Sequence, residues 1–251
     1  MHYNPAMSRS YKNITVESFD FPRNRVLAKK FEVVSKLGQG WEGEVYLIRE
    51  VLTGIERAAK FFYPQRNPSN KSFKFYAQKL HKLRHSPILI QYISQDTITY
   101  RGVPITFLVS DYVEGELLSE YISRQPGKRL SAFQGLHLLH ALAKGMESIH
   151  NANEYHGDLH TDNIIISRFG LSYDLKLIDM YYWKSPRHEN IRYDVVSMVK
   201  IFYEVLGGKK HYAKQPAEIK SIICGQKDSL ILKKFKTAGA LRDYLENMQW
   251  Q

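Results

Sequence analysis

Up to about residue 111, the hydrophobic positions follow the pattern of a β-sheet that is interrupted by one helix. Residues 31–63 carry β-branched and aromatic residues between glycine-bearing turns, which predicts strands. Apolar residues then recur at helical spacing over 71–84, which predicts an amphipathic helix with Phe73, Tyr76, Leu80 and Leu83 on its apolar face. Two more strands are expected near 89–100 and 104–110.

From about residue 115 onward, the pattern becomes mainly helical. A Ser–x–x–Gln capping box at 131–134 precedes a long apolar stripe and therefore marks the start of a helix. A pair of strands is expected between 163 and 179. A strongly apolar helix follows from about 192 and ends at the glycines 207–208, and a last helix is expected over about 229–248. The whole pattern predicts an α+β protein with a β-rich first part and a helical second part.

The composition indicates a folded chain outside the membrane. The 251 residues are 43% hydrophobic and 13% aromatic, which argues against disorder. No apolar run approaches the roughly 18 residues that a membrane span needs. The first residues lack the apolar stretch of a secretory signal, and the single cysteine, Cys224, excludes an intramolecular disulfide. We expect a cytoplasmic protein without a membrane partner.

The chain is strongly basic. Its 36 Lys and Arg residues exceed its 25 acidic residues and give a formal net charge of +11. Such a charge attracts nucleotides, nucleic acids or acidic protein surfaces, and it also serves solubility alone. Nucleic acid remains possible as a partner, but no nucleic-acid-binding motif accompanies the charge.

A glycine-rich stretch, LGQGWEGEVY, lies between two predicted strands. It contains Gly38, Gly40 and Gly43 in the spacing G-x-G-x-x-G. Glycines allow a backbone hairpin to approach phosphates closely, although by itself the spacing is also compatible with an ordinary structural hairpin. A strand rather than a helix follows Gly43, which disfavours a dinucleotide site. Lys60 comes 17 residues after Gly43 on a predicted strand, where its ammonium can reach nucleotide phosphates.

Three oxygen-bearing side chains follow in the second part of the chain. Asp158 and Asn163 lie five residues apart in the polar stretch EYHGDLHTDN, and Asp179 ends the apolar segment LKLID. Phosphoryl transfer needs one carboxylate to orient the attacking hydroxyl, and oxygen ligands to hold Mg²⁺. Each residue alone is compatible with a polar turn, but their order after the glycine loop and Lys60 favours phosphoryl transfer.

From about Phe31 to Gly208, the chain resembles the protein-kinase superfamily. The resemblance rests on the glycine loop, on AAK around Lys60, and on the segments LVSDYVEGELL, HGDLHTDN, LIDM and RYDVVSM. It implies a bilobal protein-kinase-like fold, with an antiparallel β-rich N-lobe over 31–111 and a mainly helical C-lobe over 112–251. Residues 1–30 match no motif and form an N-terminal extension, which is expected to add a strand or pack on the N-lobe through Tyr11, Phe19 and Phe21.

The resemblance also implies roles for individual residues. Lys60 and the loop from Gly38 to Gly43 would hold the phosphates of ATP, and Asp158 would be the catalytic base. Asn163 and Asp179 would be the Mg²⁺ ligands. Backbone groups from Asp111 to Val113 would hold adenine between apolar side chains, which are Leu37, Val45, Ala58 and Ile165. Asp194 resembles the family's buried helix aspartate, which accepts hydrogen bonds from the catalytic loop.

The chain departs from the family pattern at the partner of Lys60. The family usually places a glutamate on the helix after the lysine strand, but here Tyr76 aligns with that position, and no acid occurs between Glu56 and Asp96. We therefore expect Lys60 to pair with Asp179, with the phosphates or with Gln78. A nucleotide-binding pseudokinase that acts as a binding module is the corresponding alternative.

The catalytic loop and the stretch after it also differ. HGDLH is similar to the loop of aminoglycoside- and choline-type kinases, and His160 stands where protein kinases usually carry lysine. His160 either neutralises charge on the transferred group or only hydrogen-bonds the loop. Asp194 follows Asp179 by only 15 positions, which predicts a truncated activation segment without regulation by loop phosphorylation.

The sequence indicates the type of reaction more clearly than it indicates the molecule that accepts the phosphoryl group. The leading hypothesis is an ATP- and Mg²⁺-dependent kinase that acts on Ser or Thr of a protein, and the alternative is a kinase for a small hydroxylated molecule. Tyr181, Tyr182 and Trp183 either line the substrate mouth or pack in the core. Three basic residues near this stretch favour an acceptor that is anionic near the site, and these are Lys184, Arg187 and Arg192.

Overall fold

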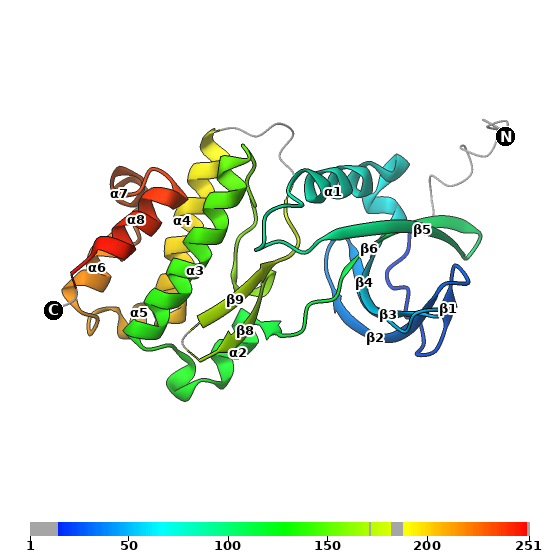
Figure 1. The fold of residues 1–251 in the computed structure, drawn as a ribbon, viewed down its shortest axis with the longest axis horizontal. Helices are drawn as coiled ribbons and strands as arrows, with labels where there is room; N and C mark the ends of the chain where they lie inside the picture. Colours follow the sequence, from blue (N-terminus) through cyan, green and yellow to red (C-terminus); the bar gives the residue numbers. More distant parts are fainter. Residues whose placement is uncertain (1–14, 171, 182–187, 250–251) are drawn as a thin grey trace. The chain divides into compact units, whose positions relative to one another are not determined.

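The computed structural model describes residues 15–170, 172–181 and 188–249 (Figure 1). Their fold divides into two compact units. The first unit comprises the described part of Met1–Arg84 together with Ile90–Val113, and the second comprises His85–Leu89 together with the described part of Glu114–Gln251. The first unit therefore ends two residues beyond the expected limit of the N-lobe, and a short segment before its last two strands belongs to the second unit.

The first unit is a six-stranded antiparallel sheet with one α-helix, in the order β1-β2-β3-β4-β6-β5. The elements are β1 (Val26–Leu27), β2 (Phe31–Gln39), β3 (Gly43–Glu50), β4 (Glu56–Phe62), η3 (Pro64–Arg66), η4 (Pro68–Asn70), α1 (Lys71–Lys82), β5 (Tyr92–Tyr100) and β6 (Val103–Asp111). The strands and the amphipathic helix predicted from the hydrophobic pattern are confirmed. Phe73, Tyr76 and Leu80 of α1 are buried, as the helical spacing requires.

Four residues of the segment 16–27 belong to the core of the first unit, and these are Val16, Phe19, Phe21 and Leu27. β1 pairs with β2, and the rings of Phe19 and Phe21 pack within the sheet's aromatic cluster. The centre of the Phe21 ring lies 4.9 Å from that of Phe61, which stacks at 4.5 Å on Phe107. The segment both adds a strand and packs on the sheet, because its alternating aromatic residues contact the rings of Tyr46 on β3, Phe61 on β4 and Tyr100 on β5. Tyr11 lies outside the described residues.

The second unit combines a small sheet with helices (Figure 1). Its antiparallel sheet has the order β7-β8-β9. Its elements are β7 (Glu116–Leu117), α2 (Leu118–Arg124), η5 (Pro126–Lys128), α3 (Ala132–Asn151), η6 (Thr161–Asn163), β8 (Ile164–Phe169), β9 (Ser172–Leu177), α4 (His188–Val205), α5 (Gly208–Tyr212), α6 (Ala217–Ile223), η7 (Cys224–Gln226), α7 (Asp228–Lys234) and α8 (Ala238–Asn247). Among the described residues, no helix has the length and apolar character needed to cross a membrane.

The start of α3 agrees with the sequence pattern, whereas the last part of the chain differs from it. The capping box is confirmed, since the Ser131 hydroxyl accepts from the N–H of Gln134 at the start of α3. The single last helix expected over 229–248 is wrong, because α7 and α8 are separate helices. Phe235 leaves α7 in an extended conformation and is buried, and the Thr237 hydroxyl then caps α8 by accepting from Ala240.

Candidate active site

The glycine loop joins β2 to β3 in the first unit. Across its base, the N–H of Gly40 donates to the carbonyl of Gly43 over 2.9 Å. Gly43 is required by packing, since a Cβ there would lie 1.9 Å from the carbonyl oxygen of Phe61. Gly38 and Gly40 face open space, with no atom within 4 Å of an added Cβ. Their backbone is therefore accessible to a ligand, which is the property expected of a phosphate-binding loop.

Lys60 lies at the centre of the sheet, with Val45 opposite it on β3 and Leu108 opposite it on β6. The residue is only 9% exposed. Its Nζ lies 3.2 Å from a carboxylate oxygen of Glu42 in the glycine loop and 4.8 Å from the ring centre of Tyr76 on α1. Glu42 was not among the partners expected for Lys60, although an acid inside the G-x-G-x-x-G stretch is visible in the chain.

The residues expected around adenine are distributed along the same sheet. Val45 and Ala58 are half-buried, while Leu37 is exposed. The Asp111 carboxylate accepts a hydrogen bond of 3.2 Å from Arg57, and the Asp111 N–H donates to the carbonyl of Gln91. The Asp111 carbonyl accepts a long hydrogen bond of 3.4 Å from the Ser110 hydroxyl and keeps a second lone pair for another donor.

In the second unit, a buried aspartate holds the catalytic loop. Asp194 on α4 has no exposed surface, and its carboxylate accepts from the backbone N–H groups of His156 and Gly157 over 2.7 and 2.9 Å. The ring of His150 on α3 makes a third contact at 3.2 Å. The expectation for Asp194 is confirmed, and the two histidines have structural roles. A buried carboxylate needs several hydrogen-bond donors, and the same hydrogen bonds fix the backbone of the catalytic loop.

Asp158 and Asn163 are joined within this loop. The Asn163 Nδ2 donates to the Asp158 carbonyl over 2.8 Å and lies 3.5 Å from its carboxylate oxygen. Asn163 is buried, whereas the Asp158 side chain is 52% exposed. The fold therefore fixes the backbone of Asp158 and leaves its carboxylate open to an acceptor.

His160 hydrogen-bonds the loop. Its Nδ1 accepts from the N–H of Asp162 over 3.2 Å and so caps the short η6 turn. In the neutral imidazole, this hydrogen bond to Nδ1 leaves Nε2 as the donor. That nitrogen lies 3.8 Å from the Asp158 carboxylate. Of the two roles left open for His160, this geometry supports the loop contact.

The segment that carries Asp179 is tied to the catalytic loop on both sides. Before it, the N–H of Ile178 donates to the Asn163 carbonyl, and the His156 ring lies 2.9 Å from the Ile178 carbonyl. After it, the N–H of Tyr181 donates to the carbonyl of His156. Asp179 itself has a φ of 54°, in the left-handed region that aspartate enters more readily than most residues. Its conformation is thus fixed by neighbours on either side.

The donor set of Asn163 and Asp179 fits Mg²⁺. The Asn163 amide nitrogen donates to Asp158, which leaves the amide oxygen as its ligand atom. Asp179 offers a carboxylate. The described part of the chain holds no cluster of three or more His, Cys, Asp or Glu residues suited to a metal. Mg²⁺ needs none, because it commonly takes one or two protein oxygens and completes its shell with phosphates and water.

The expected site residues thus fall into two groups. The first unit carries the loop glycines with Leu37, Val45, Ala58, Lys60, Asp111 and Val113, and the second carries Asp158, His160, Asn163, Ile165 and Asp179. Within the second unit, hydrogen bonds connect the catalytic loop to the segment with Asp179. Tyr181 is 44% exposed, while Tyr182 and Trp183 lie outside the described residues.

A basic hollow lies beside the start of α4. It has a volume of about 210 Å³ and is lined by His188, Arg192, Leu232 and Lys236. Among the described residues, neither Arg192 nor Lys236 forms an ion pair with a carboxylate. Lys184 and Arg187, which were expected to contribute to the same charge, lie outside the described residues.

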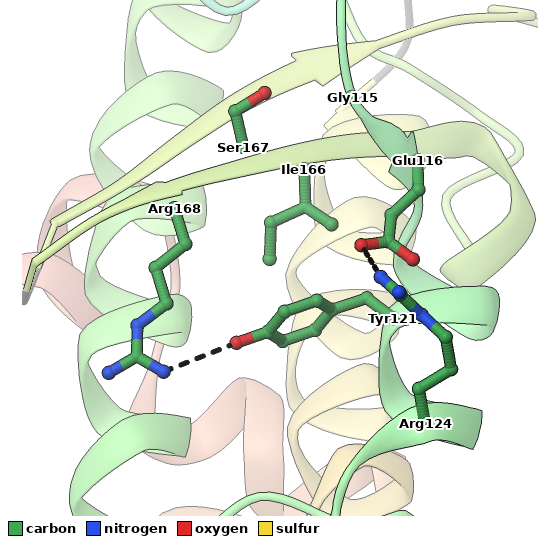
Figure 2. A pocket seen from close by; sticks show the side chains of 7 residues that line it. All are labelled: Gly115, Glu116, Tyr121, Arg124, Ile166, Ser167 and Arg168. Carbon is green, nitrogen blue, oxygen red and sulfur yellow. Dashed lines mark hydrogen bonds and ion pairs between the residues drawn. The ribbon is translucent and has the colours of Figure 1, made fainter.

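A larger cavity of about 550 Å³ lies between α2 and β8 (Figure 2). None of the expected site residues lines it. Figure 2 shows its two arginines, each directed to a neighbour in the wall: Arg124 pairs with Glu116, and Arg168 reaches the hydroxyl of Tyr121 over 3.5 Å. The Glu116 carboxylate balances the charge of Arg124, whereas the Tyr121 hydroxyl is neutral and leaves the positive charge of Arg168 in the wall of the cavity.

Comparison with known proteins identifies the family. A family model described as Protein kinase domain matches residues 31–214. The chain belongs to this protein kinase family. The kinase fold is also shown by a crystal structure of the PknI kinase domain of Mycobacterium tuberculosis, which has a TM-score of 0.63 at 16% identity and covers 90% of this chain and 97% of that one. The expected bilobal α+β kinase architecture is therefore confirmed.

Two bacterial relatives illustrate the range of kinases that the chain is similar to. It is 29% identical over 161 residues to serine/threonine-protein kinase pkn2 of Myxococcus xanthus, which covers 63% of this chain and 18% of that protein. It is 25% identical over 205 residues to a protein of Bacillus subtilis named "Probable serine/threonine-protein kinase YbdM", and the match covers 76% of this chain and 77% of that protein. The chain spans less than half the length of the first curated relatives it matches.

Proposed function

We propose that this chain is an ATP- and Mg²⁺-dependent kinase that transfers the γ-phosphoryl group to Ser or Thr of a protein. The observation that carries the proposal is the pair Asp158 and Asn163, held together by a 2.8 Å hydrogen bond on a loop that the buried Asp194 anchors. A loop fixed in this way presents the open carboxylate of Asp158 at a defined position. Membership in the protein kinase family and the names of the relatives support the same activity.

In this proposal, the second unit performs the proton and acceptor chemistry. Asp158 accepts the proton of the attacking hydroxyl, for which its exposed carboxylate is suited. Asn163 and Asp179 hold Mg²⁺, which supplies charge neutralisation at the phosphates when bound. His160 orients the loop and directs its Nε2–H toward Asp158.

The first unit binds the nucleotide in this proposal. The open backbone at Gly38 and Gly40 receives the phosphates, and Lys60 contributes its ammonium. The carbonyl of Asp111 and the backbone of Val113 contact adenine, with Leu37, Val45, Ala58 and Ile165 as the apolar surfaces around the base. Transfer requires that the two groups of residues face one nucleotide.

The basic hollow supports a protein acceptor with acidic residues near its phosphorylated hydroxyl. Arg192 and Lys236 come from distant parts of the chain and share one concave surface with His188. Neither of these side chains forms an ion pair with a described carboxylate, so an acidic side chain of an acceptor would be attracted to the hollow and could pair with them. We propose that this hollow contributes to acceptor selection.

The test is transfer from γ-labelled ATP with Mg²⁺ to an acidic protein, a basic protein and small hydroxylated molecules. We expect label on the acidic protein, lost in Asp158→Ala and reduced in Arg192→Glu, with Lys144→Ala, an exposed lysine on α3, as the control. Equal labelling by wild type and Asp158→Ala would refute the role of Asp158. Equal use of acidic and basic proteins would refute the acceptor preference.

The short stretch from Asp179 to Asp194 favours the second candidate, a kinase for small hydroxylated molecules, because little chain is available for a peptide platform. Label on small acceptors alone, in the same experiment, would establish that candidate in place of the first. Nucleotide binding without any transfer would establish a pseudokinase that acts as a binding module.

A further inference from the structure

We infer that Glu42, inside the glycine loop, is the positioning residue for Lys60 and replaces the acid that helix α1 lacks. The inference rests on the proposed function, since it assigns the residue that orients the phosphate-binding lysine. The helix α1 sequence KSFKFYAQKLHK contains no Asp or Glu, and its residue nearest the expected position is Tyr76. The carboxylate that contacts Lys60 within the first unit comes from the loop instead.

The environment of Lys60 makes an acidic partner important. The side chain is 10% exposed, and removing an ammonium from water is costly unless a charge or several acceptors compensate. The rings of Tyr76 and Phe62 lie 4.8 and 5.3 Å from Nζ and provide a partial compensation through their electron-rich faces. The Glu42 carboxylate at 3.2 Å supplies the full opposite charge.

The backbone around Glu42 is fixed, so its side chain approaches Lys60 from a defined position. The Glu42 carbonyl accepts a 2.9 Å hydrogen bond from the N–H of Tyr63, next to the end of β4. The following residue, Gly43, is packed too closely on Phe61 for any side chain. By contrast, the neighbouring Trp41 side chain is turned outward and is 65% exposed, with Arg66 over its ring. The loop therefore directs Glu42, rather than Trp41, to the lysine.

This arrangement couples the glycine loop to the lysine. In a pair supplied by α1, the helix would set the position of Lys60. Here the same loop that offers its backbone to phosphates also carries the carboxylate that orients the ammonium. A nucleotide that orders the loop thereby orders Lys60 as well.

The opposite possibility is that Glu42 occupies the place of the phosphates and must be displaced by ATP. The two alternatives predict opposite effects of removing the Glu42 carboxylate on the affinity for ATP. A positioning carboxylate strengthens nucleotide binding, so its removal weakens binding, whereas removal of a competing carboxylate tightens binding. Affinity for ATP therefore decides between them.

The test is Glu42→Gln, which keeps the shape of the side chain and removes its charge. We expect the Kd for ATP with Mg²⁺ to rise about three- to tenfold, as for loss of one charge-assisted contact. We also expect kcat/KM to fall by about tenfold to a hundredfold, because Lys60 is no longer held in place. An unchanged or lower Kd would overturn the inference.

The matched control is Glu56→Gln. Glu56 has the same side-chain exposure as Glu42, 37%, and pairs with Arg49 over 2.9 Å at the other end of the β3–β4 pair. We expect this variant to leave Kd and kcat/KM within about twofold of wild type, as for an exposed ion pair. A loss equal to that of Glu42→Gln would mean that general sheet electrostatics, rather than the contact with Lys60, is measured.

Two further variants separate position from charge. Glu42→Asp keeps the charge and should retain more activity than Glu42→Gln, while equal losses would contradict a charge contact. Tyr76→Glu in the Glu42→Gln background restores an acid on α1 and should recover kcat/KM by at least about threefold. If that buried substitution does not fold, the Glu42→Asp comparison carries the test. If wild type binds ATP but transfers no phosphate, the proposed function fails while the Kd series still decides the role of Glu42.

Discussion

The carboxylate of Glu44, which has no exposed surface, lies 2.9 Å from the ammonium of Lys36, whose side chain is 31% exposed. It also accepts hydrogen bonds from Tyr46, from Tyr63 at 3.1 Å and from Ser18 at 2.6 Å. Burial alone would raise the pKa of this carboxyl, but the hydrogen bonds from Ser18, Tyr46 and Lys36 and the charge of Lys36 outweigh burial and lower the pKa to about 2. Burial and the neighbouring Glu44 charge raise the pKa of Tyr63 to about 12.

We predict that Glu44→Gln destabilises the protein and removes part of its sensitivity to acid. Because the pKa of Glu44 is depressed in the folded state, its contribution to stability is present above the ordinary value of 4.5 and is lost as pH falls toward about 2. The variant should lose about 2–4 kcal/mol of unfolding free energy at neutral pH. Urea denaturation measured from pH 7 downward tests this, with Glu17→Gln on the exposed neighbouring segment as the control. A variant that keeps the pH dependence of wild type would refute the role of Glu44.

We predict that the segment before β1 is needed for the stability of the first unit. Phe19 is 2% exposed and its ring lies within 5.8 Å of those of Phe21, Phe61, Tyr63 and Tyr100. Phe19→Ala should therefore cost about 3–5 kcal/mol of unfolding free energy. Leu52→Ala, at a side chain that is 96% exposed, should change it by less than about 0.5 kcal/mol. Similar losses in the two variants would show that the segment does not belong to the core.

The glycines of the loop should separate into two kinds. Gly43→Ala places a Cβ 1.9 Å from the Phe61 carbonyl and should lower the melting temperature by several degrees, since backbone must move. Gly38→Ala and Gly40→Ala meet open space and should melt close to wild type while binding ATP more weakly. Thermal melting and ATP titration of the three variants measure both effects. If Gly43→Ala melted like wild type, the close approach in the structure would be contradicted.

We predict that Asp194→Asn loosens the catalytic loop. The amide replaces one acceptor with a donor that faces the N–H groups of His156 and Gly157, so a buried donor loses its partner. The free energy of unfolding should fall by about 3–5 kcal/mol, as it does when a buried charged group and its partners are separated. Asp228→Asn is the control, since Asp228 pairs with Lys200 over 3.0 Å at an exposed site and should cost less than about 1 kcal/mol. Denaturation curves of both variants give the comparison, and equal costs would contradict the anchoring role.

The hydrophobic pattern predicted most of the helices and strands because each is determined by residues that lie close together in the sequence. The apolar face of α1 follows from the spacing of Phe73, Tyr76 and Leu80, and the start of α3 follows from the capping box at Ser131. The break between α7 and α8 was not predicted, since it depends on Phe235 finding a buried position among other elements. Helical periodicity continues across such a break and does not reveal it.

The sequence by itself determined which residue types were available for phosphoryl transfer and in what order, because the kinase motifs are local. It left undecided which acid contacts Lys60. It also did not indicate that Lys36 lies beside Glu44 or that Lys236 lies beside Arg192. Lys60 and Glu42 meet through the pairing of β3 with β4, Lys36 and Glu44 through the pairing of β2 with β3, and Arg192 and Lys236 through the packing of α4 with α7. Contacts of this kind depend on the distance between side chains in space, which spacing along the chain does not specify.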